Sequence, residues 1–169
     1  IPDREVENET RYRLLEIIRQ YARDKLFEAG EGDQVRERHL DYFLALAEKA
    51  EPELRGPHQI VWLNRLDREV DNIRGALEWA VEDEVEIAMR MASALLWFWH
   101  IRSRKSEGIE WLERGLAIHA SGAVPEPWSE SQALIRGKAL NVAGSLLVMH
   151  GSPERGDELS NESLKLYRE

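Results

Sequence analysis

The sequence of 169 residues contains no cysteine, which excludes disulfide bonds, thiolate nucleophiles and the cysteine-based zinc clusters. It also lacks an apolar run of about eighteen residues and a basic, apolar leader at its beginning. We therefore expect neither a transmembrane helix nor a signal peptide, and we expect a cytoplasmic location. Basic residues are in deficit, 23 Lys and Arg against 32 Asp and Glu, and a formal charge of −9 would repel a polyanion. Direct binding of nucleic acid or of a membrane is accordingly not expected.

The common motifs of catalysis and nucleotide binding are missing as well. The five histidines are scattered, and none has the H-E-x-x-H spacing of a zinc site. There is no G-x-S-x-G nucleophile elbow, no G-x-x-x-x-G-K-[ST] phosphate loop and no basic recognition helix for DNA. His39 and Asp41 are two residues apart, so a helix would place them on different sides. We expect no enzyme activity, no metal and no cofactor in this chain, and keep a helical enzyme with an unrecognised site as a remote alternative.

Apolar residues recur at spacings of three and four along most of the chain, which predicts an all-α protein of about seven helices. The expected helices cover the ranges 14–27, 35–50, 58–80, 85–102, 109–116, 134–149 and 159–167. The range 85–102 is apolar on more than one face and should be the most buried. An alternating strand pattern is absent, apart from a few residues at 11–14. Because the connections are short, we expect the helices to pack as antiparallel hairpins.

Proline, glycine and acidic residues mark the expected helix boundaries. Loops are predicted at 52–57, 121–131 and 151–153, each of which contains proline and glycine. In the acidic turn before the helix at 85–102, Asp83 is the expected N-cap.

Residues 137–169 resemble a tetratricopeptide repeat almost position for position. The matching large and small residues are Leu140, Ala143, Gly144, Leu147, Gly151, Gly156, Ser163 and Leu164. Small residues at such positions let two helices approach closely, while large ones fill the space between hairpins. A weaker copy of the pattern begins at Met89 and comprises Ala92, Leu95, Trp99, Gly108, Gly115 and Leu116, with Ser103 at the turn where glycine is commoner. The resemblance implies antiparallel hairpins stacked as a right-handed tetratricopeptide-like superhelix.

Three further segments resemble the helical region of large bacterial signal-transduction ATPases, the multidomain regulators of the LuxR type and of the antibiotic-regulatory type. They are RYRLLEIIRQYARDKLFEAGE at 11–31, WLNRLDREVDNIRGALEWA at 62–80 and EGIEWLERGLA at 107–117. The resemblance implies a nucleotide-binding domain and a winged helix upstream, where ATP or ADP would bind, followed by repeats that act as a sensor arm. On this reading residues 1–33 form an N-terminal helix after the winged helix, and residues 34–169 form the repeat domain.

In tetratricopeptide-like stacks the first helix of each hairpin lines a concave groove. The resemblance places seven residues on that side: Arg90, Ser93, Trp97, His100, Lys138, Asn141 and Ser145. Arg90 and Lys138 could clamp the carboxylate of a small inducer or of an acidic peptide, with Trp97 as an apolar floor. The alternative is that two repeats are too few for a groove and that these residues meet the next repeat.

These features predict a non-catalytic regulatory module, a piece of a longer bacterial ATPase or transcriptional regulator, that relays inducer or partner binding to an upstream ATPase domain. The first alternative is a free-standing tetratricopeptide scaffold that joins other proteins. If the C-terminal edge is truncated, Leu159, Leu164 and Tyr167 could also join two copies into a dimer.

Overall fold

The computed structural model describes residues 21–22, 25–26, 28–123 and 127–168, except for the side chains of residues 122 and 123. The chain divides into two compact units, residues 1–39 and 40–169. The strand considered at 11–14 and most of the helix expected at 14–27 lie outside the described residues. The helix α2 begins in the first unit, and its part from Leu40 onward belongs to the second unit.

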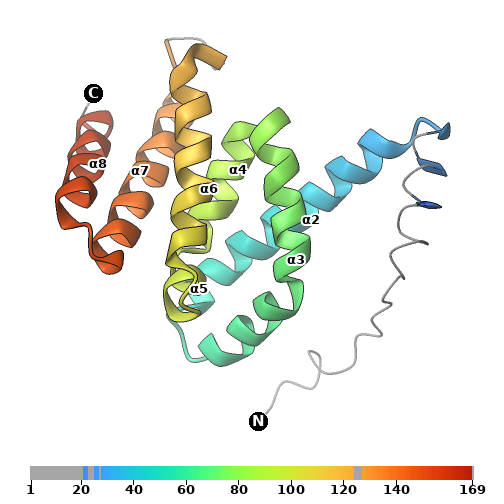
Figure 1. The fold of residues 1–169 in the computed structure, drawn as a ribbon, viewed down its shortest axis with the longest axis horizontal. Coiled ribbons are helices and arrows are strands. Elements are labelled where there is room, and N and C mark those ends of the chain that lie inside the picture. The colour runs from blue at the N-terminus through green and yellow to red at the C-terminus, as the bar shows by residue number, and fades with distance from the viewer. Residues whose placement is uncertain (1–20, 23–24, 27, 124–126, 169) are drawn as a thin grey trace. The chain divides into compact units, whose positions relative to one another are not determined.

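The described part of the chain is helical throughout and contains no strand, which confirms the all-α prediction. Seven α-helices and one short π-helical segment, η1, follow one another along these residues (Figure 1). Their bounds are α2 Gly32–Glu53, α3 Gln59–Asp83, α4 Val85–Ala94, α5 Leu96–Ile101, α6 Lys105–Ile118, η1 His119–Ala123, α7 Glu130–His150 and α8 Pro153–Leu166. No described helix has the length and apolar content needed to cross a membrane.

The helix expected at 85–102 is divided at Leu95 into α4 and α5. Across the break, the indole Nε1 of Trp99 donates a hydrogen bond to the carbonyl oxygen of Ala92, 3.1 Å away. A side-chain donor inserted into the backbone ladder is a recognised cause of a helix break. The prediction that this range is the most buried agrees with the structure, since Leu95, Phe98 and Trp99 are all 0% exposed.

Several expected boundaries were wrong. Helix α2 continues through Pro52 to Glu53, where a loop was expected from Pro52. Asp83 is the last residue of α3 rather than a cap, and Glu84 precedes α4 without a side-chain capping bond. The expected loop at 121–131 begins with η1, and α7 starts at Glu130 after a capping box formed by Ser129. Helix α8 begins at Pro153 instead of near 159. Proline is tolerated at the first position of a helix, because the backbone N–H that it lacks would have no acceptor within the helix there.

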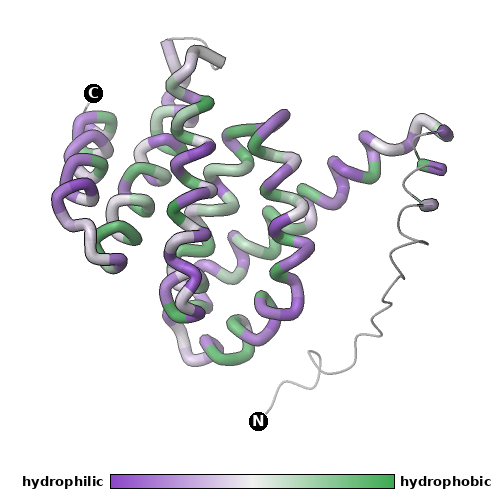
Figure 2. The backbone as a smooth tube through the Cα atoms, viewed as in Figure 1, coloured by the Kyte–Doolittle hydropathy of each residue, from purple (hydrophilic) through white to green (hydrophobic). Residues whose placement is uncertain are grey.

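The second unit has a core built from helices that are close in sequence. Helix α7 packs along α8 and beside α6, and α4 packs against α3, α6 and α7 (Figure 1). Apolar positions recur along each helix between polar ones, as Figure 2 shows by colour. The outer helices therefore turn an apolar side to their neighbours and a polar side to solvent, whereas six of the ten residues of α4 are buried.

The small residues of the repeat pattern lie where helices approach most closely. A Cβ added at Gly144 would come within 2.7 Å of the carbonyl oxygen of Gly156, so α7 and α8 touch backbone to backbone there. At Gly108 the same atom would come within 2.6 Å of the Trp99 ring, where α6 meets α5. The hydroxyl of Ser163 donates to the carbonyl oxygen of Gly137 over 2.7 Å, which joins α8 to α7 a second time. These contacts form within hairpins, and the stacking of hairpins into a right-handed superhelix stays a prediction.

Candidate functional site

The seven residues predicted for the groove lie on α4, α5 and α7. Arg90 and Ser93 belong to α4, and Trp97 and His100 belong to α5. The other three belong to α7, which packs against α4: Lys138, Asn141 and Ser145. The predicted residues of α4 and α7 therefore lie on packed helices that belong to two different hairpins.

Both predicted cations pair with carboxylates from α2. Arg90 donates from Nε and Nη2 to one oxygen of Glu48, at 3.0 and 2.6 Å. Lys138 Nζ contacts both oxygens of Glu51, at 2.7 and 2.8 Å. All four side chains are about two-fifths exposed, so each pair contributes at most about 1 kcal/mol to stability. Their importance is geometric, because they place α2 across α4 and α7.

The apolar side of α2 is buried in the same unit. Leu40, Phe43, Leu46, Ala47 and Ala50 are each at most 5% exposed. Burial of this kind is the main driving force for helix packing, at about 25 cal/mol per Å² of apolar surface. The two ion pairs therefore place Glu48 and Glu51 of α2 beside Arg90 and Lys138, on the side where an open groove was considered.

An opening with a volume of about 220 Å³ lies beside α2. Its walls combine three predicted residues with three others: Arg90, Ser93, Lys138, Glu48, Leu134 and Ile135. Ser93 is only 1% exposed, and its hydroxyl has no hydrogen-bond partner among the described residues. An unpaired buried hydroxyl is uncommon and costs free energy unless a bound group satisfies it.

The four other predicted residues lie outside this opening. The guanidinium of Arg55 stacks over the Trp97 ring at 5.2 Å, and His100 meets that ring edge-on at 5.7 Å. The backbone carbonyl of exposed Asn141 accepts a hydrogen bond from the hydroxyl of Ser145 at 2.9 Å. Trp97 does not line this opening, whose apolar residues are Leu134 and Ile135, and its role as the floor of a ligand site stays a prediction.

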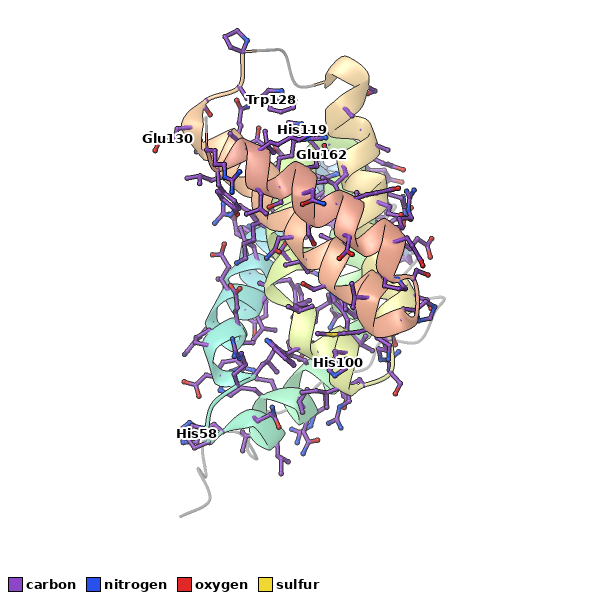
Figure 3. All side chains as sticks on the ribbon, turned by 90° about the vertical axis from the view of Figure 1, so that its left-hand side faces the viewer. His58, His100, His119, Trp128, Glu130 and Glu162 are labelled. Atoms are coloured by element: carbon purple, nitrogen blue, oxygen red, sulfur yellow. The ribbon has the colours of Figure 1, made fainter. Side chains whose placement is uncertain are left out.

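A second polar cluster lies beside the C-terminal end of α6 and the N-terminal end of α7 (Figure 3). It is formed by His119, Trp128, Arg136 and Glu162. The rings of His119 and Trp128 meet edge-on at 4.7 Å, and the guanidinium of Arg136 lies 5.1 Å from the Trp128 ring centre. Arg136 also donates to Glu162 over 2.7 Å. Through Arg136, the cluster links Trp128, which precedes α7, to Glu162 of α8.

The pKa of His119 is lowered in this cluster. Burial lowers its pKa, the positive charge of Arg136 lowers it further, and the carboxylate of Glu86 opposes both. Neither ring nitrogen has a hydrogen-bond partner among the described residues. No group of three or more His, Asp or Glu side chains in the described part of the chain is placed to hold a metal ion.

Comparison with curated proteins identifies relatives in Mycobacterium bovis and in two strains of Mycobacterium tuberculosis, all provisionally named HTH-type transcriptional regulators. Each is 41% identical to this chain over 103 residues, which is 60% of the chain but 12% of the relative. No family model matches the chain, and no solved structure matches it significantly. The chain is thus similar to a small part of proteins named as transcriptional regulators.

Proposed function

We propose that this chain is a non-catalytic regulatory module of a bacterial transcriptional regulator, and that it binds an effector between α2, α4 and α7. The observation that carries the proposal is the 41% identity to regulators in which the matched segment is 12% of the length. A segment of that size within a much longer regulator is expected to work together with other domains.

The contacts within the hairpins support a tetratricopeptide-like arm. Gly144 and Gly156, where the repeat pattern requires a small residue, lie at a close contact between α7 and α8. Repeats of this kind bind partners or ligands on an exposed face without catalysing a reaction, and this property suits a sensor. In this proposal the parent protein also contains a nucleotide-binding domain, and ATP or ADP binds there and not in this chain.

The effector site supports the sensing part of the proposal. It combines an unpaired buried hydroxyl, Ser93, with the cations Arg90 and Lys138 on two helices that belong to different hairpins. An effector that contacts both helices would favour one relative position of the hairpins, and its differential affinity would bias the remainder of the protein.

The test is calorimetry of this chain against the separately expressed segment that precedes it in its gene, with ATP, with ADP and without nucleotide. We expect association that depends on the nucleotide, because a relay arm must distinguish the states of the switch. Absence of association in all three conditions would contradict the relay. A reading frame without a phosphate-binding loop before Ile1 would instead favour the alternative, a free-standing scaffold.

A control variant makes this measurement specific. Exchanging Glu113 for glutamine removes the exposed pair with Arg155, which lies between α6 and α8 and away from α2. This variant should associate as the parent does.

A further inference from the structure

Helix α2 determines what size of molecule can reach the predicted groove. Its apolar residues, among them Ala47 and Ala50 at 0% exposure, are part of the core, and its two carboxylates occupy Arg90 and Lys138. A peptide that contacted Arg90 and Lys138 would have to displace both of these ion pairs.

The space that α2 leaves free has the size of a small organic molecule. Its volume is about 220 Å³, whereas a cavity of about 150 Å³ is sufficient to hold benzene. One ring with a short polar substituent therefore fits, and a peptide segment of several residues does not.

The hydroxyl of Ser93 distinguishes this opening from the remainder of the helical surface. A serine inside a helix commonly bonds to the carbonyl four residues earlier. Ser145 does so with Asn141 at 2.9 Å, and Ser160 does so with Gly156 at 2.9 Å. Ser93 has no partner among the described residues, although it is almost fully buried. Ser93 therefore combines an unpaired hydroxyl with a place among the residues that line the opening.

The donors of the wall favour a ligand that carries a strong acceptor. Arg90 and Lys138 line the opening, and each is paired with a carboxylate of α2, Arg90 with Glu48 and Lys138 with Glu51. Arg90 uses Nε and Nη2 for Glu48, which leaves Nη1 without a hydrogen-bond partner among the described residues. A carboxylate could accept from Nη1 and from the Ser93 hydroxyl, and charge-assisted bonds of this kind are the stronger ones.

The apolar wall completes the description of the ligand. Leu134 and Ile135 are neighbours on α7, and Leu134 is 48% exposed at the opening. We propose that the opening between α2, α4 and α7 binds a small organic monocarboxylate with an apolar body of about one ring. This inference rests on the proposed sensor function and names the chemical class of its effector.

The probe is benzoate, with benzamide as a neutral molecule of nearly the same shape. Binding to the full chain is followed by calorimetry and by the shifts of backbone amide signals in NMR spectra. We expect benzoate to bind, benzamide to bind at least about tenfold more weakly, and the shifted signals to include Ser93 and Leu134. Equal binding of the two molecules, or no binding of benzoate at millimolar concentration, would overturn the proposal.

Two matched pairs of variants locate the site. Ser93→Ala should weaken benzoate binding about tenfold through loss of a donor to a charged group, whereas Ser145→Ala should leave it unchanged. Leu134→Glu places a negative charge at the opening and should weaken binding about tenfold, whereas Met149→Glu, at another exposed position of α7, should not. Equal affinities within both pairs would place the ligand elsewhere.

A peptide with the sequence of residues 40–54 tests the excluded occupant. Competition between this peptide and benzoate would show that α2 can be displaced, and would overturn the assignment to a small ligand. The outcome is independent of the relay test: nucleotide-dependent association without benzoate binding removes only the ligand class. Benzoate binding without association removes the relay.

Discussion

Replacing Gly144 by alanine tests whether α7 and α8 depend on direct backbone contact. The added Cβ would lie 2.7 Å from the carbonyl oxygen of Gly156 and 2.7 Å from the hydroxyl oxygen of Ser160. The hydroxyl can turn away, but the carbonyl belongs to the backbone of α8. The clash is therefore relieved only if the two helices move apart along their contact.

The magnitude follows from two opposing effects. Overpacking of a close contact costs about 1–3 kcal/mol, and a backbone contact this short belongs at the upper end. Alanine is favoured over glycine inside a helix by about 1 kcal/mol, which offsets part of the cost. We expect Gly144→Ala to lower the free energy of unfolding by about 2 kcal/mol, or the melting temperature by about 4–8 °C for a chain of this size.

Gly75→Ala is the matched control. Gly75 is an exposed residue of α3, and no atom lies within 4 Å of its added Cβ. Only the helix propensity then changes, and this variant should be more stable than the parent by about 0.5–1 kcal/mol. Urea unfolding followed by tryptophan fluorescence measures both variants. If Gly144→Ala were as stable as the parent, the close approach of α7 and α8 would be refuted.

Three further predictions concern protonation and capping. The lowered pKa of His119 means that the folded state binds this proton less readily than the unfolded state, so the stability present above about pH 6.5 should fall as the pH decreases below it. The urea midpoint of His119→Phe should therefore differ less between about pH 8 and pH 5.5 than the midpoint of the parent does. An equal difference in both proteins would contradict this prediction. Ser129→Ala removes the capping box of α7 and should lower the free energy of unfolding by about 1 kcal/mol in the same assay. A decrease of only a few tenths of a kcal/mol would contradict a stabilising role of this cap. The guanidinium of Arg74, which donates to Glu107 at 2.6 and 2.8 Å, holds the pKa of that carboxyl below its ordinary value of 4.5. The stability from this pair should therefore be present above about pH 4.5 and lost as the pH falls, so Arg74→Met and the parent should converge in acid and differ at neutral pH.

Much of the fold could be predicted from residues that are close in sequence. The apolar period of three to four identified α3 almost to its observed bounds, because its stripe from Leu63 to Ala80 is regular and buried throughout. The break at Leu95 could not be found in this way, since the periodicity continues through it. It depends on where the indole of Trp99 lies in three dimensions.

The candidate site was predictable only in part. The repeat pattern placed Arg90, Ser93 and Lys138 on helices that do meet at one opening. It missed Glu48 and Glu51, whose side chains flank the apolar stripe of α2 and look like ordinary solvated carboxylates in the sequence.

The sequence by itself determined the helical class, the positions of most helices and the small residues at which hairpins close, because these depend on spacing within one or two helices. Only the tertiary structure decided that α2 places carboxylates against Arg90 and Lys138, beside an opening of about 220 Å³. The residues responsible are far apart in the chain: Glu48 and Arg90 are separated by 42 positions, and Glu51 and Lys138 by 87. No local pattern encodes such pairings, since they arise when the burial of apolar side chains brings distant helices together.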